Sequence, residues 1–234
     1  LDFLESAITK STKAIMPVHL FGCPVDMERL TNIAQKYGLK VIEDCAQALG
    51  ASWNGTSIGV WGDIGCFSFF PTKNLGAAGD AGAITTNNSA IAKRVRELGI
   101  HGMPRRYFHT QLGYNSRLDA IQAAILNVKL PKVSGWISRR NHIFSKYKSL
   151  LEGITLLSLP DNSLGINSVH ACNQFVVKVN DFVLNELQRK TETLSLDLGL
   201  PDSKCRDWLK YELEKNGVNT IIYYPIPIHL QPAY

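Results

Sequence analysis

The sequence lacks the features of a secreted, zinc-binding or membrane-spanning protein. Among its 234 residues are five cysteines, an odd number, and no two of them form a C-x-x-C pair. This pattern argues against a disulfide framework and a zinc site, and it favours a reducing, cytoplasmic compartment. No apolar run reaches the length of a membrane span, and the N-terminus does not resemble a signal peptide.

The sequence also lacks a concentrated basic patch. Its net charge is +5, but the densest basic pairs lie in three separate segments, Lys93-Arg94, Arg105-Arg106 and Arg139-Arg140. Scattered cations are typical of a solvated surface and argue against a nucleic acid partner. No His, Cys and carboxylate residues have metal-ligand spacing, and no G-x-x-x-x-G-K-[ST] loop is present. Because 45% of the residues are hydrophobic, the chain can bury a sizeable core in one or two domains.

Strand and helix patterns alternate over the first half of the chain. Apolar runs predict strands at residues 14–20, 38–44, 66–70 and 83–86, and periodic apolar positions predict helices at residues 25–37 and 90–98. This alternation predicts βαβ units, an α/β fold and a mostly parallel sheet.

The second half of the chain has a different pattern. After an irregular stretch at residues 99–113, helices are predicted at residues 118–130 and 131–151, and we place a domain boundary between them. We therefore expect a large domain of residues 1–130 and a smaller α+β domain of residues 131–234. The smaller domain contains a predicted strand at 174–179, a predicted helix at 206–216 and an apparent insertion at 181–203.

Two reactive side chains stand at the ends of predicted strands. Lys73 follows the strand at residues 66–70, which Pro71 ends, and it precedes a segment with glycines at positions 76, 79 and 82. Asp44 ends the strand at residues 38–44, so both groups are expected at one edge of the sheet. For either residue alone the simpler interpretation is structural: a solvated lysine, or an aspartate that caps a helix.

Together the two groups indicate a particular cofactor. An amine that can form a Schiff base and an acid that can keep a pyridine nitrogen protonated are what pyridoxal 5'-phosphate chemistry requires of a protein. Lys73 would form the Schiff base and then, as a free amine, carry a proton during the reaction. Asp44 would keep the pyridine nitrogen protonated.

Five segments resemble, in order and spacing, the DegT/DnrJ/EryC1/StrS family of sugar aminotransferases. They read PVHLFG (17–22), EDCAQ (43–47), FSFFPTKNLG (67–76), GYNSRLDAIQAA (113–124) and YYPIPIHLQPAY (223–234). The resemblance implies the aspartate-aminotransferase-like fold type I of pyridoxal-phosphate enzymes. It implies transfer of an amino group from an amino acid, with glutamate as the expected donor, to a nucleotide-linked keto sugar. Some family relatives are dehydratases with His at the Schiff-base position, so Lys73 favours transamination.

The resemblance also implies roles for further residues. Gln47 matches a position that hydrogen-bonds the phenolic oxygen of the cofactor ring, and Ser68 matches a serine that binds the phosphate. Asn115 matches an asparagine that reaches the phosphate of the neighbouring subunit, which implies a homodimer with shared sites. The simpler alternatives are an inward core serine for Ser68 and a helix N-cap for Asn115 or Ser116.

Three residues are expected to contact the substrate: His19, Tyr223 and His229. His19 ends the first predicted strand, and the other two lie in the last of the five segments. A hydrogen-bonded structural histidine is an equal alternative for both histidines.

Two rival hypotheses and one expectation about the chain ends remain. A different fold-type-I enzyme could act on an amino acid alone, but the arginine clamp that it would need for the carboxylate is not identifiable. A non-catalytic remnant that forms dimers or regulates is the second rival. Relative to the family, segments before residue 8 and after residue 234 are missing. They include the phosphate-receiving helix, so we expect the chain as given to bind the cofactor poorly.

Overall fold

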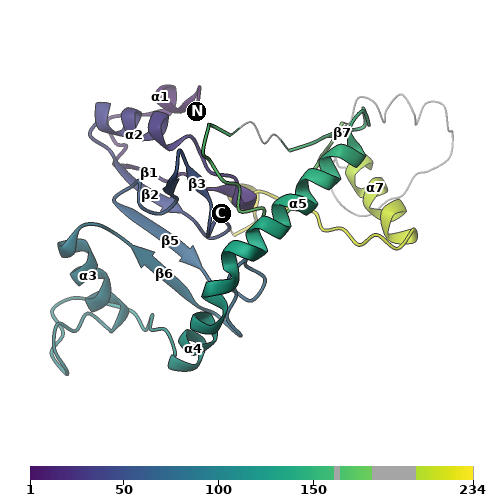
Figure 1. Ribbon diagram of the computed structural model, residues 1–234. Helices are drawn as coiled ribbons and strands as arrows, with labels where there is room; N and C mark the ends of the chain where they lie inside the picture. Colours follow the sequence, from purple (N-terminus) through teal and green to yellow (C-terminus); the bar gives the residue numbers. More distant parts are fainter. Residues whose placement is uncertain (161–163, 181–203, 234) are drawn as a thin grey trace. The chain divides into compact units, whose positions relative to one another are not determined.

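The computed structural model describes residues 1–160, 164–180 and 204–233 (Figure 1). The chain forms two compact units. Unit 1 comprises Leu1–Leu150 and Asp161–Val176, and unit 2 comprises Leu151–Pro160 and Val177–Tyr234. The predicted boundary after residue 130 falls within unit 1, and as a division between functional domains it stays a prediction. The predicted insertion at 181–203 lies outside the described residues.

The main sheet of unit 1 has four strands, β1 (Ala14–Ile15), β2 (Lys40–Asp44), β5 (Ile64–Ser68) and β6 (Gly82–Thr85). Their order is β1-β2-β5-β6. The β1–β2 and β2–β5 pairs are parallel, and β6 runs antiparallel to β5 (Figure 1). The predicted α/β class with a mostly parallel sheet is therefore confirmed. Beyond β1, a parallel bridge between Val18 and Asp44 continues the pairing with β2.

Helix α2 (Met27–Lys36) is the crossover between β1 and β2, as the sequence predicts. Asp26 caps its N-terminus by accepting a hydrogen bond of 3.0 Å from the N–H of Arg29. Its apolar face, which includes Met27 and Leu30, is buried in a core that also contains Val41 and Cys45. This packing fixes β2, and with it the position of Asp44. The short helices α1 (Leu4–Ala7) and η1 (Leu20–Gly22) flank this region.

A second core lies under the segment that follows β5. Leu75 and Ala77 pack there with side chains from helix α4 (Ala120–Lys129) and helix α5 (Val133–Leu151), which the turn η2 (Leu130–Lys132) joins. Helix α3 (Ser89–Gly99) precedes them and is capped by Asn88. The helices predicted at 90–98, 118–130 and 131–151 are thus all present, with boundaries shifted by a few residues.

The remaining elements are short. Strands β3 (Ser52–Trp53) and β4 (Thr56–Ser57) form a hairpin in unit 1, while β7 (Leu157–Ser158) pairs with β8 (Lys178–Val179) in unit 2. Unit 2 also contains helix α7 (Lys204–Lys215) and the turn η3 (Ile228–Leu230). None of the helices in the described part of the chain is long and apolar enough to cross a membrane.

The strand predicted at 174–179 is wrong for its first residues. Its pairing is confined to Lys178–Val179, because the backbone before it bonds elsewhere. The N–H groups of Asn173 and Gln174 both donate to the carbonyl of Phe21, at 3.0 and 3.3 Å. Residues 170–174 therefore lie beside η1 and are not part of a sheet.

Candidate active site

Three segments of unit 1 meet at one edge of the sheet. They follow the parallel strands β1, β2 and β5, whose C-terminal ends share that edge, the usual position of a ligand site in an open α/β sheet. Backbone bonds join the segments: the N–H of His19 donates to the carbonyl of Asp44 at 3.1 Å, and the N–H of Cys45 donates to the carbonyl of Cys66 at 2.8 Å. The structure thus brings Asp44, Gln47, Ser68 and Lys73 to this edge, while their roles stay predictions.

Lys73 lies in a turn that directly follows β5. Its N–H donates to the carbonyl of Phe70 at 2.9 Å, and the N–H of Ala77 donates to the carbonyl of Phe69 at 2.8 Å. A side chain at Gly76 would overlap the carbonyl of Pro71, so this turn requires glycine there. Lys73 itself is half-buried, whereas Asn74 to Ala77 are buried. The turn is therefore anchored by its later residues.

Asp44 is fixed through its backbone by both neighbouring segments. Its N–H donates to the carbonyl of Pro17 at 2.9 Å, and its own carbonyl accepts from His19. One carboxylate oxygen accepts a hydrogen bond of 3.0 Å from the N–H of Ala46, two residues on. This is an Asx turn that leads into further turns and then β3, with no helix, so the alternative in which Asp44 caps the next helix is wrong.

Gln47 and Ser68 both accept hydrogen bonds from backbone N–H groups. The Oε1 of Gln47 accepts from the N–H of Phe21 at 2.6 Å. Phe21 has a left-handed backbone, with φ 59° and ψ 8°, which is uncommon for a bulky residue, so this bond supports an unfavourable conformation. The Oγ of Ser68, at the end of β5, accepts from the N–H of Phe70 at 3.3 Å.

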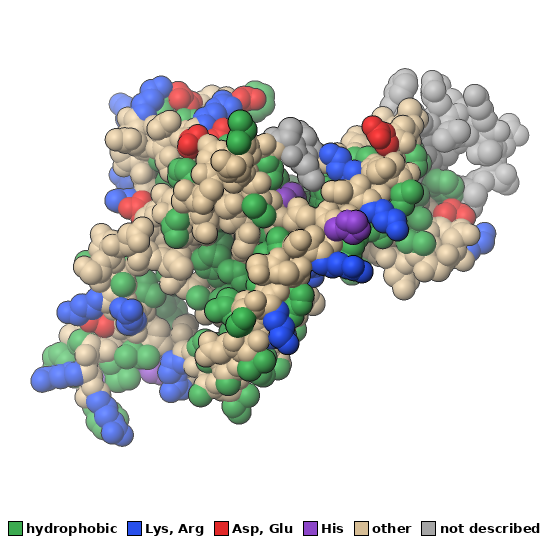
Figure 2. Space-filling model, viewed as in Figure 1, with side chains coloured by type: hydrophobic (Ala, Val, Ile, Leu, Met, Phe, Trp, Pro, Cys, Tyr) green, Lys and Arg blue, Asp and Glu red, His purple; other side chains and the backbone are tan. Residues whose placement is uncertain are grey.

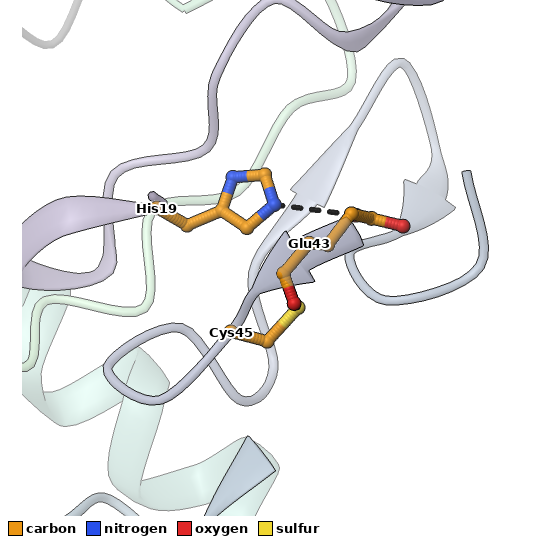
Figure 3. Close-up of side chains that lie close together, drawn as sticks. All are labelled: His19, Glu43 and Cys45. Carbon is orange, nitrogen blue, oxygen red and sulfur yellow. Dashed lines mark hydrogen bonds and ion pairs between the residues drawn. The ribbon is translucent and has the colours of Figure 1, made fainter. Parts of the chain in front are cut away.

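A buried pair that the sequence did not reveal lies behind this edge (Figure 3). The Nε2 of His19 lies 3.2 Å from Oε2 of Glu43, and both side chains are fully buried. The Nδ1 of His19 accepts from the N–H of Val25 at 3.1 Å, so the ring proton is on Nε2 and points at the carboxylate. Both ring nitrogens thus have partners within the chain. The substrate contact expected for His19 stays a prediction, and it would require one of these bonds to break.

Glu43 accepts three further hydrogen bonds from the loop after β4. The N–H groups of Gly59, Trp61 and Gly62 donate to it at 2.8, 2.9 and 2.8 Å. Burial raises the pKa of this carboxyl, but the hydrogen bonds from His19, Gly59 and Gly62 outweigh burial, and the net pKa lies below its usual value. The signal in the sequence was strand alternation, which puts Glu43 on the buried face of β2 with Val41 and Cys45.

The same region gathers three potential metal ligands. The ligand atoms of His19, Glu43 and Cys45 all lie within 4.8 Å of one another (Figure 3). Burial raises the pKa of the Cys45 thiol, and the negative charges of Glu43 and Asp44 raise it further, so the thiol stays protonated. With the imidazole and the carboxylate committed to hydrogen bonds, this cluster is a structural brace between the segment after β1, β2 and the loop at 59–62.

Asn115 lies in the irregular segment between α3 and α4. It is exposed, its Oδ1 accepts from Nε of Arg117 at 3.0 Å, and its backbone bridges that of Ile100. The N-cap position of α4 is Asp119, so the alternative in which Asn115 or Ser116 caps this helix is wrong.

Tyr223 and His229 belong to unit 2. Tyr223 is 40% exposed, and His229 is exposed within η3. Their predicted substrate contacts stay predictions.

Comparison with known proteins identifies the family. Residues 1–234 match the DegT/DnrJ/EryC1/StrS aminotransferase family. The chain is 42% identical over 231 residues to UDP-N-acetyl-3-dehydro-alpha-D-glucosamine 3-aminotransferase of Acidithiobacillus ferrooxidans, covering 99% of this chain and 55% of that protein. It is 37% identical to dTDP-3-amino-3,4,6-trideoxy-alpha-D-glucose transaminase of Streptomyces venezuelae, covering 99% and 54%.

Solved structures agree. The crystal structure of S. venezuelae DesV superposes with a TM-score of 0.83 at 37% identity, covering 98% of this chain and 55% of that one. NtdA of Bacillus subtilis, solved with the bound cofactor PMP, has a TM-score of 0.76 at 32% identity, covering 99% and 48%. These likenesses confirm the expected fold type I. The chain spans about half the length of the curated relatives that it matches. Over that half, its sequence and fold are those of the family. It belongs to the DegT/DnrJ/EryC1/StrS aminotransferase family.

Proposed function

We propose that the protein is a pyridoxal-phosphate-dependent aminotransferase. It would move an amino group from an amino acid, with glutamate as the expected donor, to a keto sugar linked to a nucleotide. The observation that carries the proposal is the position of Lys73, half-buried on an anchored turn at the sheet edge where Asp44 ends the adjacent strand. The names of the relatives, which are transaminases of UDP- and dTDP-linked sugars, support the substrate class.

The side chains at this edge fit the cofactor chemically. They supply a primary amine (Lys73), a carboxylate (Asp44), a hydroxyl (Ser68) and an amide (Gln47), all at or just after the C-terminal ends of parallel strands. The cysteine nearest to Asp44 in the chain is Cys45, which is buried and protonated, so it does not compete with Lys73 as a nucleophile. When bound, pyridoxal phosphate supplies a ring that accepts electrons from the reacting carbon.

Each residue then has a defined task. Lys73 would hold the cofactor covalently and, once displaced, its Nζ would move a proton during the transfer. The carboxylate of Asp44 would keep the pyridine nitrogen protonated, and its hydrogen-bonded backbone would fix that charge in place. Ser68 would bind the phosphate. Gln47 would reach the ring oxygen while its Oε1 supports the backbone of Phe21.

We propose that the active protein is a homodimer. Helix α4 exposes apolar side chains, with Ile121 73% and Val128 69% exposed, and hydrophobic atoms gather over this helix in Figure 2. An exposed apolar helix face favours a covering partner. Asn115 lies just before α4 and is itself exposed, so Asn115 of the partner subunit could reach the phosphate. We also propose a cytoplasmic location, since Cys45, Cys66 and Cys172 are present as thiols.

An amino-transfer assay tests the proposed function. The full-length protein is supplied with pyridoxal phosphate, glutamate and either a UDP- or a dTDP-linked keto sugar, and 2-oxoglutarate is measured. We expect 2-oxoglutarate to accumulate beyond one equivalent per active site only when a keto sugar nucleotide is present. Equal formation without the sugar, or with a 2-oxo acid in its place, would favour an enzyme that acts on amino acids alone.

A further inference from the structure

Helix α4 holds the chain just beyond Lys73 through two polar side chains. The Oε1 of Gln122 accepts a hydrogen bond of 2.8 Å from the N–H of Ala78. The ammonium of Lys129 donates to the carbonyl of Gly76. Figure 1 shows α4 beside the end of the β5–β6 region, where these contacts occur. The helix thus binds two backbone groups of one short loop, residues 76–79.

The two side chains lie on one face of the helix. They are seven residues apart, which is close to two helical turns. Leu126 lies between them on this face and is buried in the same cluster as Leu75 and Ala77. The polar contacts therefore flank an apolar one, and together they fix both the position and the orientation of the loop.

We propose that Gln122 and Lys129 are positioning residues for Lys73. They form a clamp, called here the α4 clamp, that holds the loop at 76–79 and so sets the direction from which the Lys73 amine enters the site. The inference rests on the proposed function, because it assigns the clamp to the residue that would bind the cofactor. Neither side chain is assigned a contact with substrate or cofactor.

The loop offers little space for an alternative arrangement. A Cβ on Gly79 would lie 3.3 Å from Nε2 of Gln122, and a Cβ on Gly76 would overlap the carbonyl of Pro71. Gly76 therefore lets the turn approach the backbone of Pro71, and Gly79 leaves room for Gln122. Between Lys73 and this loop, Nδ2 of Asn74 donates to the carbonyl of Ala171 at 2.7 Å. The chain that directly follows Lys73 is thus anchored at two successive points.

The clamp also suits its task electrostatically. A hydrogen bond from an ammonium to a carbonyl is stronger than one between neutral groups. Lys129 is partly buried, so water competes with this bond less than it would on an open surface. Loss of either contact would leave a backbone group of the loop hydrogen-bonded only to water and would allow the loop to move.

Matched pairs of variants separate positioning from folding. Gln122→Met removes the acceptor, whereas Gln122→Glu keeps one. Lys129→Met removes the charge at similar length, whereas Lys129→Arg keeps it. Asn127→Ala, an exposed position on the same helix, is the control.

The first readout is hydrogen exchange in the cofactor-free, full-length protein. In the Met variants, exchange of peptides covering residues 76–79 should be about tenfold faster than in the wild type, as expected for a lost hydrogen bond. The Glu, Arg and Ala variants should resemble the wild type.

The second readout is the adduct between Lys73 and pyridoxal phosphate, trapped with borohydride. In the Met variants the adduct should form more slowly, and the pH midpoint of the visible absorbance, measured before reduction, should shift. A clamp that only supports folding would lower thermal stability without moving this midpoint. If Lys129→Met does not fold, the Gln122 pair decides the question.

The outcomes are distinguishable. A wild type without an adduct at Lys73 would overturn the proposed function and, with it, the positioning role. A normal adduct in the wild type, with the same midpoint and formation rate in both Met variants, would overturn the α4 clamp alone.

Discussion

The imidazole of His19 and the carboxylate of Glu43 form a fully buried pair, with Nε2 3.2 Å from Oε2. Glu43 also accepts hydrogen bonds from the N–H groups of Gly59, Trp61 and Gly62, so one carboxylate joins the segment after β1, β2 and the loop at 59–62. Asp44 is the next residue along β2. The pair therefore stabilises the strand end that presents the proposed partner of the pyridine nitrogen.

Glu43→Gln should destabilise the protein by about 3 kcal/mol, because it places an amide N–H against backbone N–H groups and removes a buried charge from its partners. Urea denaturation at neutral pH measures the free energy of unfolding. The control is Glu5→Gln, which cuts an exposed ion pair with Lys36 and should have a much smaller effect. Equal losses in the two variants would contradict the bracing role of Glu43.

His170 should make stability depend on pH. Burial lowers the pKa of this imidazole from 6.5 to about 4, so the folded protein binds the proton less readily than the unfolded chain does. Its contribution is therefore fully present above pH 6.5 and is lost as pH falls toward 4, with a total of roughly 3 kcal/mol.

His170→Asn tests this pH dependence. Asn can replace the ring nitrogen that accepts from the N–H of Cys172 at 2.8 Å, but it does not titrate. The difference in unfolding free energy between wild type and variant should change steadily between pH 6.5 and 4. A constant difference over this range would mean that His170 is not held neutral by the fold.

Most elements of the fold could be predicted from local patterns. The crossover helix predicted at 25–37 is α2, whose apolar face and Asp26 cap are both local signals. The strand predicted at 174–179 pairs only at its end, and this could not be predicted from the sequence. Asn173 and Gln174 bond instead to Phe21, some 150 residues earlier. Such tertiary pairing leaves no periodic trace in the sequence.

The candidate site likewise contains features that local patterns predict and features that only the folded structure reveals. Lys73 and Asp44 can be predicted because one follows an apolar strand and the other ends one, and parallel topology then brings them to one edge. The brace at Glu43 was missed because a single carboxylate next to Asp44 resembles a second exposed acid. The contacts of Gln122 and Lys129 were also missed, since only the folded loop shows which backbone groups they bind.

Asp44→Asn should bind pyridoxal phosphate but lose transamination activity by about a hundredfold or more, because the shape is kept and the charge on the pyridine nitrogen is not. Cofactor absorbance and turnover are measured on the same sample. Asp119→Asn, at an exposed residue with no side-chain cap bond, is the matched control and should be unaffected. Near-normal turnover of Asp44→Asn would mean that another carboxylate has this role.

Mixing two inactive variants tests the shared site. Lys73→Ala and Asn115→Ala should each be nearly inactive alone. If Asn115 serves the partner subunit, a mixed dimer has one site with both changes and one with neither. Subunit exchange between equal amounts of the two variants should therefore restore activity to about a quarter of all sites. No recovery, with exchange demonstrated by differently tagged subunits, would show that each site is built from one chain.

The most direct test of the account is to identify the lysine that binds the cofactor. The full-length protein is incubated with pyridoxal phosphate, reduced with borohydride and digested, and the modified peptide is identified by mass spectrometry. We predict a single pyridoxyl group on Lys73, and we predict that Lys73→Ala lacks both the visible absorbance band and transamination activity. Modification of a different lysine, or a band that persists in Lys73→Ala, would contradict the assignment.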